Sequence, residues 1–311
     1  RAGRVQSGDL GFAKKAPKSY FEAHYVPHRV VHPGPNGLLT GYYEPVLRGS
    51  RHSSADYPVP LYRQPEDLVK VEADAARGYR NDTLVAGRMI DGDIVPYFTR
   101  REIELGALDD LGLDFLYLAD PIDAFFLHVQ GSGLIELDDG TSVRIGYAAK
   151  NGHPYTSIGR VLIERGEIAE SDMTLAALRT WLETHPEQAA DVMRENASFI
   201  FFQEHNEADV ESAGPVGSLG VTLTDGRSLA VDTSYHELGT PVFVSSATLD
   251  CHGSKGFHRL MVAQDVGSAI RGPERGDIFW GTGDEAGRLA GETIHEGTFF
   301  VLLPRQAGSS Q

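Results

Sequence analysis

Cysteine is nearly missing from this chain, which has one, Cys251, among 311 residues. A single cysteine cannot form an intramolecular disulfide, and it excludes a zinc site built from several cysteines. Long hydrophobic runs are missing too, since no apolar stretch approaches the ~18 residues that a membrane-spanning helix needs. The first residue is Arg1, and we expect any signal peptide or lipid anchor to belong to a longer precursor.

Positive charge is scarce, with 28 lysine and arginine residues against 44 aspartate and glutamate residues and a formal net charge of −16. Such a chain should repel nucleic acid, and no basic stripe with interleaved aromatic residues is present. The simplest interpretation of the acidic excess is solubility. We therefore expect no nucleic-acid partner.

Motifs for metals and phosphates are also absent. The 12 histidines are scattered, and none belongs to a His-Glu-x-x-His pattern. The Gly-rich stretches at 131–133 and 281–287 lack the Lys-Ser/Thr ending of a phosphate-binding loop. We expect neither a metal site nor a cofactor.

Apolar runs and turn residues predict strands near both ends of the chain, at 38–46 and from residue 221 onward. Residues 8–29 are expected to hold a helix that packs on the main domain. The polar, Gly-rich piece 207–220 is interpreted as a linker. One economical arrangement is a β-barrel made of residues 1–47 and 206–311, with residues 48–205 inserted as a second domain.

The middle of the chain mixes two patterns. Residues 114–119 and 124–130 are both interpreted as β-structure, with a turn at 131–133. Asp138, Asp139 and Gly140 separate two further runs, 134–137 and 142–146, which is a hairpin signal. Helical spacing follows, with helices predicted to begin at Ser157, Ser171 and Pro186.

The candidate catalytic residues are three aspartates at predicted strand ends. Asp265 and Asp277 lie at the two ends of a Gly-rich loop, and Asp232 follows the apolar run 229–231. Clustered carboxylates with few bases nearby suggest acid chemistry on a neutral polymer, of which glycoside cleavage is the leading case. An aspartate at a strand end is also a common turn former, so the pattern alone leaves both interpretations open.

Several blocks of sequence carry a family resemblance. They are GYYEP at 41–45, DPIDAFF at 120–126, VQGSG at 129–133, GYAAKNGHPYTSIG at 146–159, GRSLAVD at 226–232, LGT at 238–240, AQDVGSAIRG at 263–272 and GDIF at 276–279. In this order they resemble the membrane-bound lytic murein transglycosylase A family, with its three-aspartate domain. The chain departs from the family pattern at Ser268, where a second glycine is expected, and at Arg271, where lysine is expected.

The resemblance implies a fold that is mainly β with helices. It implies a double-psi β-barrel with an inserted β-rich second domain, and glycan binding in the groove between them. It also implies cleavage of the β-1,4 bond between N-acetylmuramic acid and N-acetylglucosamine, without water and with a 1,6-anhydro end. Asp277 would be the general acid and base, with Asp265 and Asp232 as supporting carboxylates.

The same resemblance, with the position of aromatic and amide groups, suggests a set of substrate-binding residues. Neighbouring residues of a strand face opposite sides, so one ring of the Tyr42–Tyr43 pair is expected in the core and the other could line the groove. The candidates are Tyr42, Tyr43, Glu44, Gln130, Gly131, Ser132, Gly133, Lys150, Asn151, His153 and Tyr155.

Two other functions remain open at this stage. One is a hydrolytic muramidase or β-glucanase on the same barrel, and the other is a non-catalytic module that binds cell-wall glycan. The expected partners are peptidoglycan glycan strands, together with proteins of cell-wall synthesis or division. The expected location is the periplasm, with outer-membrane association in the full-length precursor.

Overall fold

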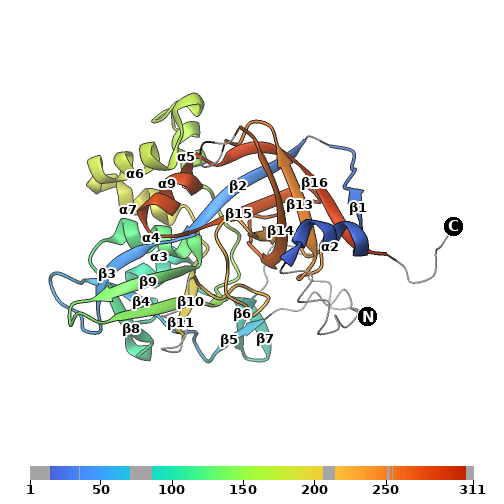
Figure 1. Ribbon diagram of the computed structural model, residues 1–311. Coiled ribbons are helices and arrows are strands. Elements are labelled where there is room, and N and C mark those ends of the chain that lie inside the picture. The colour runs from blue at the N-terminus through green and yellow to red at the C-terminus, as the bar shows by residue number, and fades with distance from the viewer. Residues whose placement is uncertain are drawn as a thin grey trace.

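The computed structural model describes residues 15–34, 36–70, 86–205, 214–250, 253 and 255–305. These residues form two β-rich units side by side, with a group of helices at one end (Figure 1). No helix of this described part is long and apolar enough to cross a membrane.

The first unit is a barrel made from both ends of the chain. Its sheet has the order β1-β16-β13-β14-β12-β15-β2, and β16 pairs with β2 as well, which closes a ring of six strands. The pairs β12–β14 and β15–β2 are parallel, and the other pairs are antiparallel. The strands are β1 (Tyr25–Arg29), β2 (Gly37–Glu44), β12 (Ser228–Val231), β13 (Pro241–Ser246), β14 (Phe257–Asp265), β15 (Arg275–Thr282) and β16 (Ile294–Pro304).

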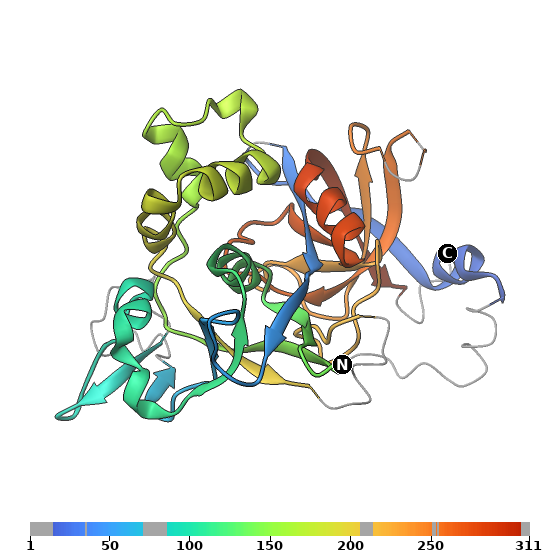
Figure 2. The same cartoon turned by 90° about the vertical axis from the view of Figure 1, so that its left-hand side faces the viewer.

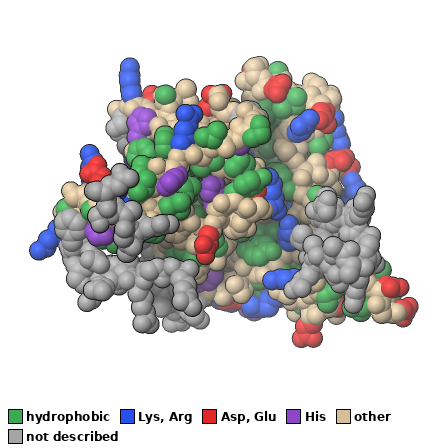
Figure 3. All heavy atoms as spheres, turned by 90° about the vertical axis from the view of Figure 1, so that its right-hand side faces the viewer, with side chains coloured by type: hydrophobic (Ala, Val, Ile, Leu, Met, Phe, Trp, Pro, Cys, Tyr) green, Lys and Arg blue, Asp and Glu red, His purple; other side chains and the backbone are tan. Residues whose placement is uncertain are grey.

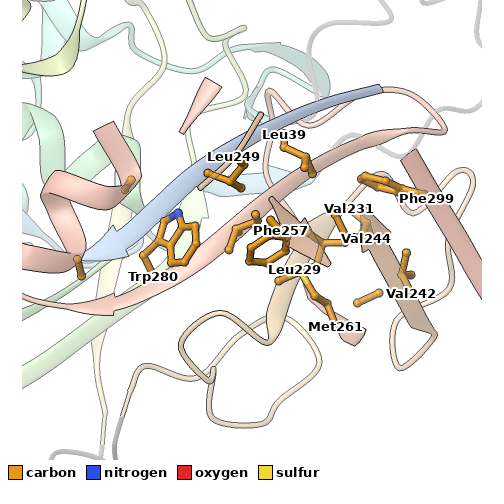
Figure 4. Close-up of a cluster of buried hydrophobic side chains, with 14 residues drawn as sticks. Leu39, Leu229, Val231, Val242, Val244, Leu249, Phe257, Met261, Trp280 and Phe299 are labelled. Atoms are coloured by element: carbon orange, nitrogen blue, oxygen red, sulfur yellow. The ribbon is translucent and has the colours of Figure 1, made fainter. Parts of the chain in front are cut away.

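Side chains alternate between the two faces of these strands, and those that point inward fill the barrel interior. Leu39, Phe257 and Trp280 point into one cluster of buried side chains (Figure 4). Helix α2 (Pro17–His24) precedes β1, and α9 (Asp284–Glu292) packs on β2 and β15. On the barrel face turned away from the second unit, hydrophobic side chains lie among polar ones and the visible acidic side chains are scattered (Figure 3). The acidic excess is therefore not gathered on that face.

The second unit contains a six-stranded sheet of order β11-β10-β9-β3-β8-β4 and a three-stranded sheet of order β5-β6-β7. The hairpin predicted around Asp139 and Gly140 is confirmed, because β9 and β10 pair as antiparallel neighbours. The strands are β3 (Val46–Ser50), β4 (Val59–Tyr62), β5 (Leu68–Lys70), β6 (Ala86–Ile90), β7 (Asp93–Pro96), β8 (Asp114–Leu118), β9 (Ser132–Leu137), β10 (Ser142–Lys150) and β11 (Ile200–Glu204).

Helices pack on this unit, and some of them also reach the barrel, since α4 contacts β2 and α6 contacts α9. Figure 2 shows α5, α6 and α7 at one end, β5–β7 at the other, and α4 between them. Helices α4 to α7 share one buried apolar cluster. The helices are α3 (Arg100–Glu102), η2 (Ile103–Ala107), η3 (Asp109–Leu111), α4 (Pro121–Gln130), α5 (Ile158–Glu164), η4 (Glu170–Asp172), α6 (Leu175–Thr184) and α7 (Pro186–Arg194).

The prediction of β-structure at 124–130 is wrong, since these residues belong to α4. Asp120 is the N-cap and accepts hydrogen bonds from the backbone N–H groups of Ile122 and Asp123, and Pro121 occupies the first turn. Gly131, with φ of 87°, ends the helix in the left-handed conformation. A short apolar run does not distinguish a buried strand from a buried helix, whereas the cap and the glycine do.

Two smaller expectations need adjustment. The helix predicted from Ser171 begins at Leu175 with Thr174 as its cap, after a short 3-10 turn at Glu170–Asp172. The predicted N-terminal helix and the predicted linker lie partly outside the described residues, at 8–14 and 207–213. The helices predicted at Ser157 and Pro186 are confirmed.

The chain passes from one unit to the other at Pro45, between β2 of the barrel and β3 of the six-stranded sheet. Beside this crossing, the carboxylate of Glu44 receives hydrogen bonds from Arg144 Nε and Nη2 at 2.8 and 3.1 Å. Thr282 on β15 donates to the same carboxylate at 2.7 Å. Because Arg144 lies on β10, this buried ion pair ties the two units together.

Candidate active site

A cavity of about 610 Å³ lies between the barrel and the second unit. The barrel contributes the ends of β12, β14 and β15 and the loop from residue 266 to 271. The second unit contributes the end of α4 and parts of β10 and β11. Two of the three predicted acids, Asp265 and Asp277, line it.

Asp277 lies on β15 and is partly buried beside the cavity. The Thr40 hydroxyl on the neighbouring strand β2 donates to Asp277 Oδ1 at 2.6 Å. Burial raises the pKa of Asp277 to about 6, and the charge of Asp265 acts in the same direction. The Thr40 hydrogen bond and the charge of Arg275 partly oppose this rise. Asp277 can therefore exist as a neutral acid at a pH where exposed aspartates are ionised.

Asp265 lies at the end of β14, and strand β12 separates it from Asp277 on β15. Ala230 on β12 pairs with Asp265 on one side and with Asp277 on the other. The backbone N–H and hydroxyl of Ser218 donate to Asp265 Oδ1 at 3.0 and 2.7 Å, and the Tyr42 hydroxyl donates to Oδ2 at 2.9 Å. Three donors hold this carboxylate as a fixed anion facing the cavity.

Tyr42 lines the cavity and contacts Asp265 through its hydroxyl. Its ring lies 5.3 Å from that of Phe279, measured between centroids. Burial, and then the charge of Asp265, raise the pKa of Tyr42 well above its usual value. The hydroxyl therefore remains a donor to Asp265.

Asp232 is placed differently from the other two acids. It is 4% exposed and does not line the cavity. The backbone N–H groups of Gly272 and Ser234 donate to its carboxylate at 2.8 and 3.0 Å. Burial opposes ionisation of Asp232, but these donors outweigh it and the pKa is lowered. Asp232 holds the β14–β15 loop in place, which is the turn-forming role that the sequence left open.

The second unit supplies the opposite wall. Of the predicted binding residues, Gln130, Gly131, Ser132, Lys150 and Tyr155 line the cavity, as does Tyr42 from the barrel. The Gln130 carboxamide oxygen accepts a hydrogen bond from the Tyr43 backbone N–H at 3.1 Å, which fixes the end of α4 against β2.

The other five predicted binding residues lie outside the cavity lining. Tyr43 packs against the barrel core, and Glu44 is fully buried in its pair with Arg144. A Cβ at Gly133 would lie 2.6 Å from Leu127 Cδ1, so this glycine serves close packing. Asn151 binds the backbone of Phe98, Ala197 and Phe199, and His153 Nε2 lies 2.8 Å from the carbonyl oxygen of Tyr97.

Three residues of the site escaped the sequence reasoning. Thr40 could have been found from strand alternation, because it shares a strand face with Tyr42. Arg275 is two residues before Asp277 on β15 and so faces the same side. Ser218 lies in the stretch interpreted as a linker, and only the fold brings it to Asp265.

The site can donate a proton from the Asp277 carboxyl group, and the hydrogen-bonded Asp265 carboxylate lies nearby. Among the described residues, no cluster of histidine, cysteine, aspartate or glutamate side chains could hold a metal ion. The two carboxyl groups themselves offer acid–base and electrostatic chemistry.

Comparison with known proteins identifies the family. The model of the MltA specific insert domain matches residues 38–203, and that of the 3D domain matches residues 227–303. The "Membrane-bound lytic murein transglycosylase A" of Escherichia coli K12 is 37% identical over 272 residues, which are 86% of this chain. The chain belongs to the membrane-bound lytic murein transglycosylase A (MltA) family. The matched region spans 66% of the length of that relative.

Solved structures of the MltA family agree with this placement. A membrane-bound lytic murein transglycosylase from Agrobacterium tumefaciens is 38% identical, with a TM-score of 0.85 over 98% of this chain and 81% of that chain. Escherichia coli MltA with bound chitohexaose is 31% identical, with a TM-score of 0.76 over 96% and 84% of the two chains. The predicted fold class, a closed barrel with a second β-rich unit, is confirmed.

Proposed function

We propose that this chain is a lytic transglycosylase that cleaves the β-1,4 bond between N-acetylmuramic acid and N-acetylglucosamine in peptidoglycan. The observation that carries the proposal is Asp277, a carboxyl group with its pKa raised to about 6 on the wall of a cavity between two units. Family membership and the names of the relatives support the same reaction.

In the first step, neutral Asp277 protonates the glycosidic oxygen as the C1–O bond breaks. With a pKa of about 6, roughly a tenth of the molecules hold this proton at pH 7, which suffices for a general acid. The sugar that loses its leaving group develops positive charge at C1. The fixed anion Asp265 is placed to stabilise that charge.

In the second step, the C6 hydroxyl of the same sugar attacks C1 and forms the 1,6-anhydro ring. Asp277, now a carboxylate, accepts the hydroxyl proton and returns to its starting state. No water is consumed: one proton passes from Asp277 to the leaving oxygen, and another passes from the C6 hydroxyl to Asp277.

The same geometry argues against hydrolysis. A glycoside hydrolase normally needs a second carboxylate that acts as nucleophile or activates water. Among the described cavity-lining residues, the second acid is Asp265, and its oxygens already accept three hydrogen bonds from Ser218 and Tyr42. One free acid fits a reaction in which one group serves both steps.

Replacing Asp277 with asparagine tests the assignment. The asparagine side chain keeps the shape but cannot donate the proton, so Asp277→Asn should lower the release of muropeptides from peptidoglycan by about 10²-fold or more. The measurement is mass spectrometry of the digest, with exposed Asp56→Asn as the matched control. Products of the parent that carry an added water would indicate hydrolysis. No products from the parent would indicate a binding module.

The proposal extends to the domain division, the location and the partners of the protein. The proposed division is a barrel domain of residues 1–47 and 206–311 and an insert of residues 48–205. The strand order supports it in outline, because β2 and β3 belong to different sheets, with the crossing at Pro45, two residues before the proposed boundary. The protein acts in the cell envelope, in the periplasm and at the outer membrane, which the membrane-bound relatives support. Its partners are glycan strands and proteins of cell-wall synthesis or division.

A further inference from the structure

The charge of the cavity differs in sign from that of the whole protein. The chain has a net charge of −16, yet among the described residues the charged side chains that line the cavity are three cations and two acids, namely Lys150, Arg271, Arg275, Asp265 and Asp277. Arg275 lies beside Asp277 and donates to the Gly276 carbonyl oxygen at 2.7 Å. Lys150 and Arg271 have no such place in the acid–base chemistry, so their charges call for another explanation.

These two cations come from opposite walls. Lys150 ends β10 in the second unit, and Arg271 lies in the β14–β15 loop of the barrel. Both line the same cavity, and burial, followed by the charge of Arg271, lowers the pKa of Lys150. Two like charges facing one space repel each other, and an anion placed between them would relieve that repulsion.

Lys150 is not paired with an anion in the described part of the chain, and Arg271 is paired only at long range. The Lys150 ammonium makes no hydrogen bond or ion pair with any residue in the described part of the chain, although the side chain is half-buried. Arg271 Nη1 lies 3.8 Å from Asp232 Oδ1, but its side chain is 66% exposed and Asp232 already has two backbone donors. An ammonium group that is partly removed from water is stabilised more by an anionic partner than by a sugar hydroxyl.

We propose that Lys150 and Arg271 form a carboxylate-binding site in the groove, which selects glycan strands that carry acidic groups over neutral ones. This inference rests on the proposed function and names the substrate feature that the groove recognises. The carboxylate has two sources in peptidoglycan: the lactyl ether of muramic acid in peptide-free strands, and the peptide stem in intact strands. Arginine would bind it through paired N–H groups and lysine as a point charge.

The test measures binding without turnover, in an Asp277→Asn background. Calorimetry compares three ligands: a neutral chitooligosaccharide, peptide-free murein strands with free lactyl carboxylates, and strands that keep their stems. Lys150→Met and Arg271→Gln should each weaken binding of a carboxylate-bearing ligand by about tenfold, and that of the chitooligosaccharide by less than about twofold. Lys18→Met, on the exposed surface of α2, is the matched control.

Two further readouts separate a charge contact from a structural role. Salt should weaken binding of the acidic ligand to the parent, and this dependence should be smaller in Lys150→Met. Lys150→Arg should restore most of the affinity. A loss confined to stem-bearing strands assigns the site to the stem, and a loss that includes peptide-free strands assigns it to the lactyl group.

The inference is overturned if both variants bind all three ligands like the parent, or if they lose the neutral and acidic ligands equally. Its failure is distinct from failure of the proposed reaction. Charge-selective binding is measured here without catalysis, whereas the reaction is judged by whether the parent forms 1,6-anhydro products.

Discussion

The residues of β2 have different roles according to the side of the strand on which they lie. Leu39 and Tyr43 pack with the barrel core. Thr40 and Tyr42, on the other side, donate hydrogen bonds to Asp277 and Asp265. One strand therefore supports the fold with one face and holds two acids by hydrogen bonds with the other.

The hydrogen bond from Thr40 to Asp277 gives a pH prediction. This bond stabilises the carboxylate form and so lowers the pKa of Asp277, which burial raises to about 6. Activity requires the protonated acid and should fall as the pH rises through about 6. In Thr40→Val the pKa rises further, so this fall should move upward by roughly half to one pH unit.

The measurement is the pH dependence of kcat/KM. The variant Asp265→Asn should shift this dependence in the opposite direction. Removing the negative charge of Asp265 should lower the pKa of Asp277 and move the fall to lower pH. If the fall in activity occurs at the same pH in Thr40→Val as in the parent, another group controls it.

At the scale of elements, α4 delivers Gln130 to the cavity, and its two ends decide where that side chain lies. Asp120 Oδ1 accepts from the Ile122 backbone N–H at 2.6 Å, and Gly131 adopts a positive φ at the other end. The Gln130 carboxamide then meets the Tyr43 backbone N–H. A helix whose ends are fixed in this way positions a cavity-lining side chain without a loop.

Removal of the cap should therefore affect stability more than chemistry. We expect Asp120→Ala to lower the free energy of unfolding by about 1 kcal/mol, because two backbone N–H groups lose their acceptor. Chemical denaturation of the variant would measure this loss. Exposed Asp56→Asn serves as the control, and an unchanged midpoint for Asp120→Ala would show that the cap contributes nothing.

At the scale of the whole molecule, the cavity exists because two units are held at a fixed distance. The Glu44–Arg144 pair is the buried polar link between them, with side-chain exposures of 0% and 4%. Thr282 adds a third contact from β15. The groove between the units thus depends on a charge pair that neither unit could complete alone.

Breaking this pair should cost more than an ordinary surface ion pair. Arg144→Met leaves the Glu44 carboxylate buried without its partner, and we expect a loss of about 3–5 kcal/mol in unfolding free energy. Calorimetry should also show the units beginning to unfold separately. The exposed pair Arg160–Glu164 gives the comparison, since Arg160→Met should cost less than about 1 kcal/mol.

The sequence by itself determined the family, the barrel's acids and the hairpin, because these depend on residues close together in the chain. Asp265 and Asp277 flank one loop, and Asp139-Gly140 defines one turn, so local pattern suffices. The tertiary structure decided which candidates reach the cavity. Asp232 turned inward to backbone donors, Glu44 paired across one hundred residues with Arg144, and Ser218 and Thr40 reached the acids from distant segments. Burial, long-range pairing and the desolvation that raises the pKa of Asp277 all depend on which distant groups surround a residue, and spacing along the chain does not contain that information.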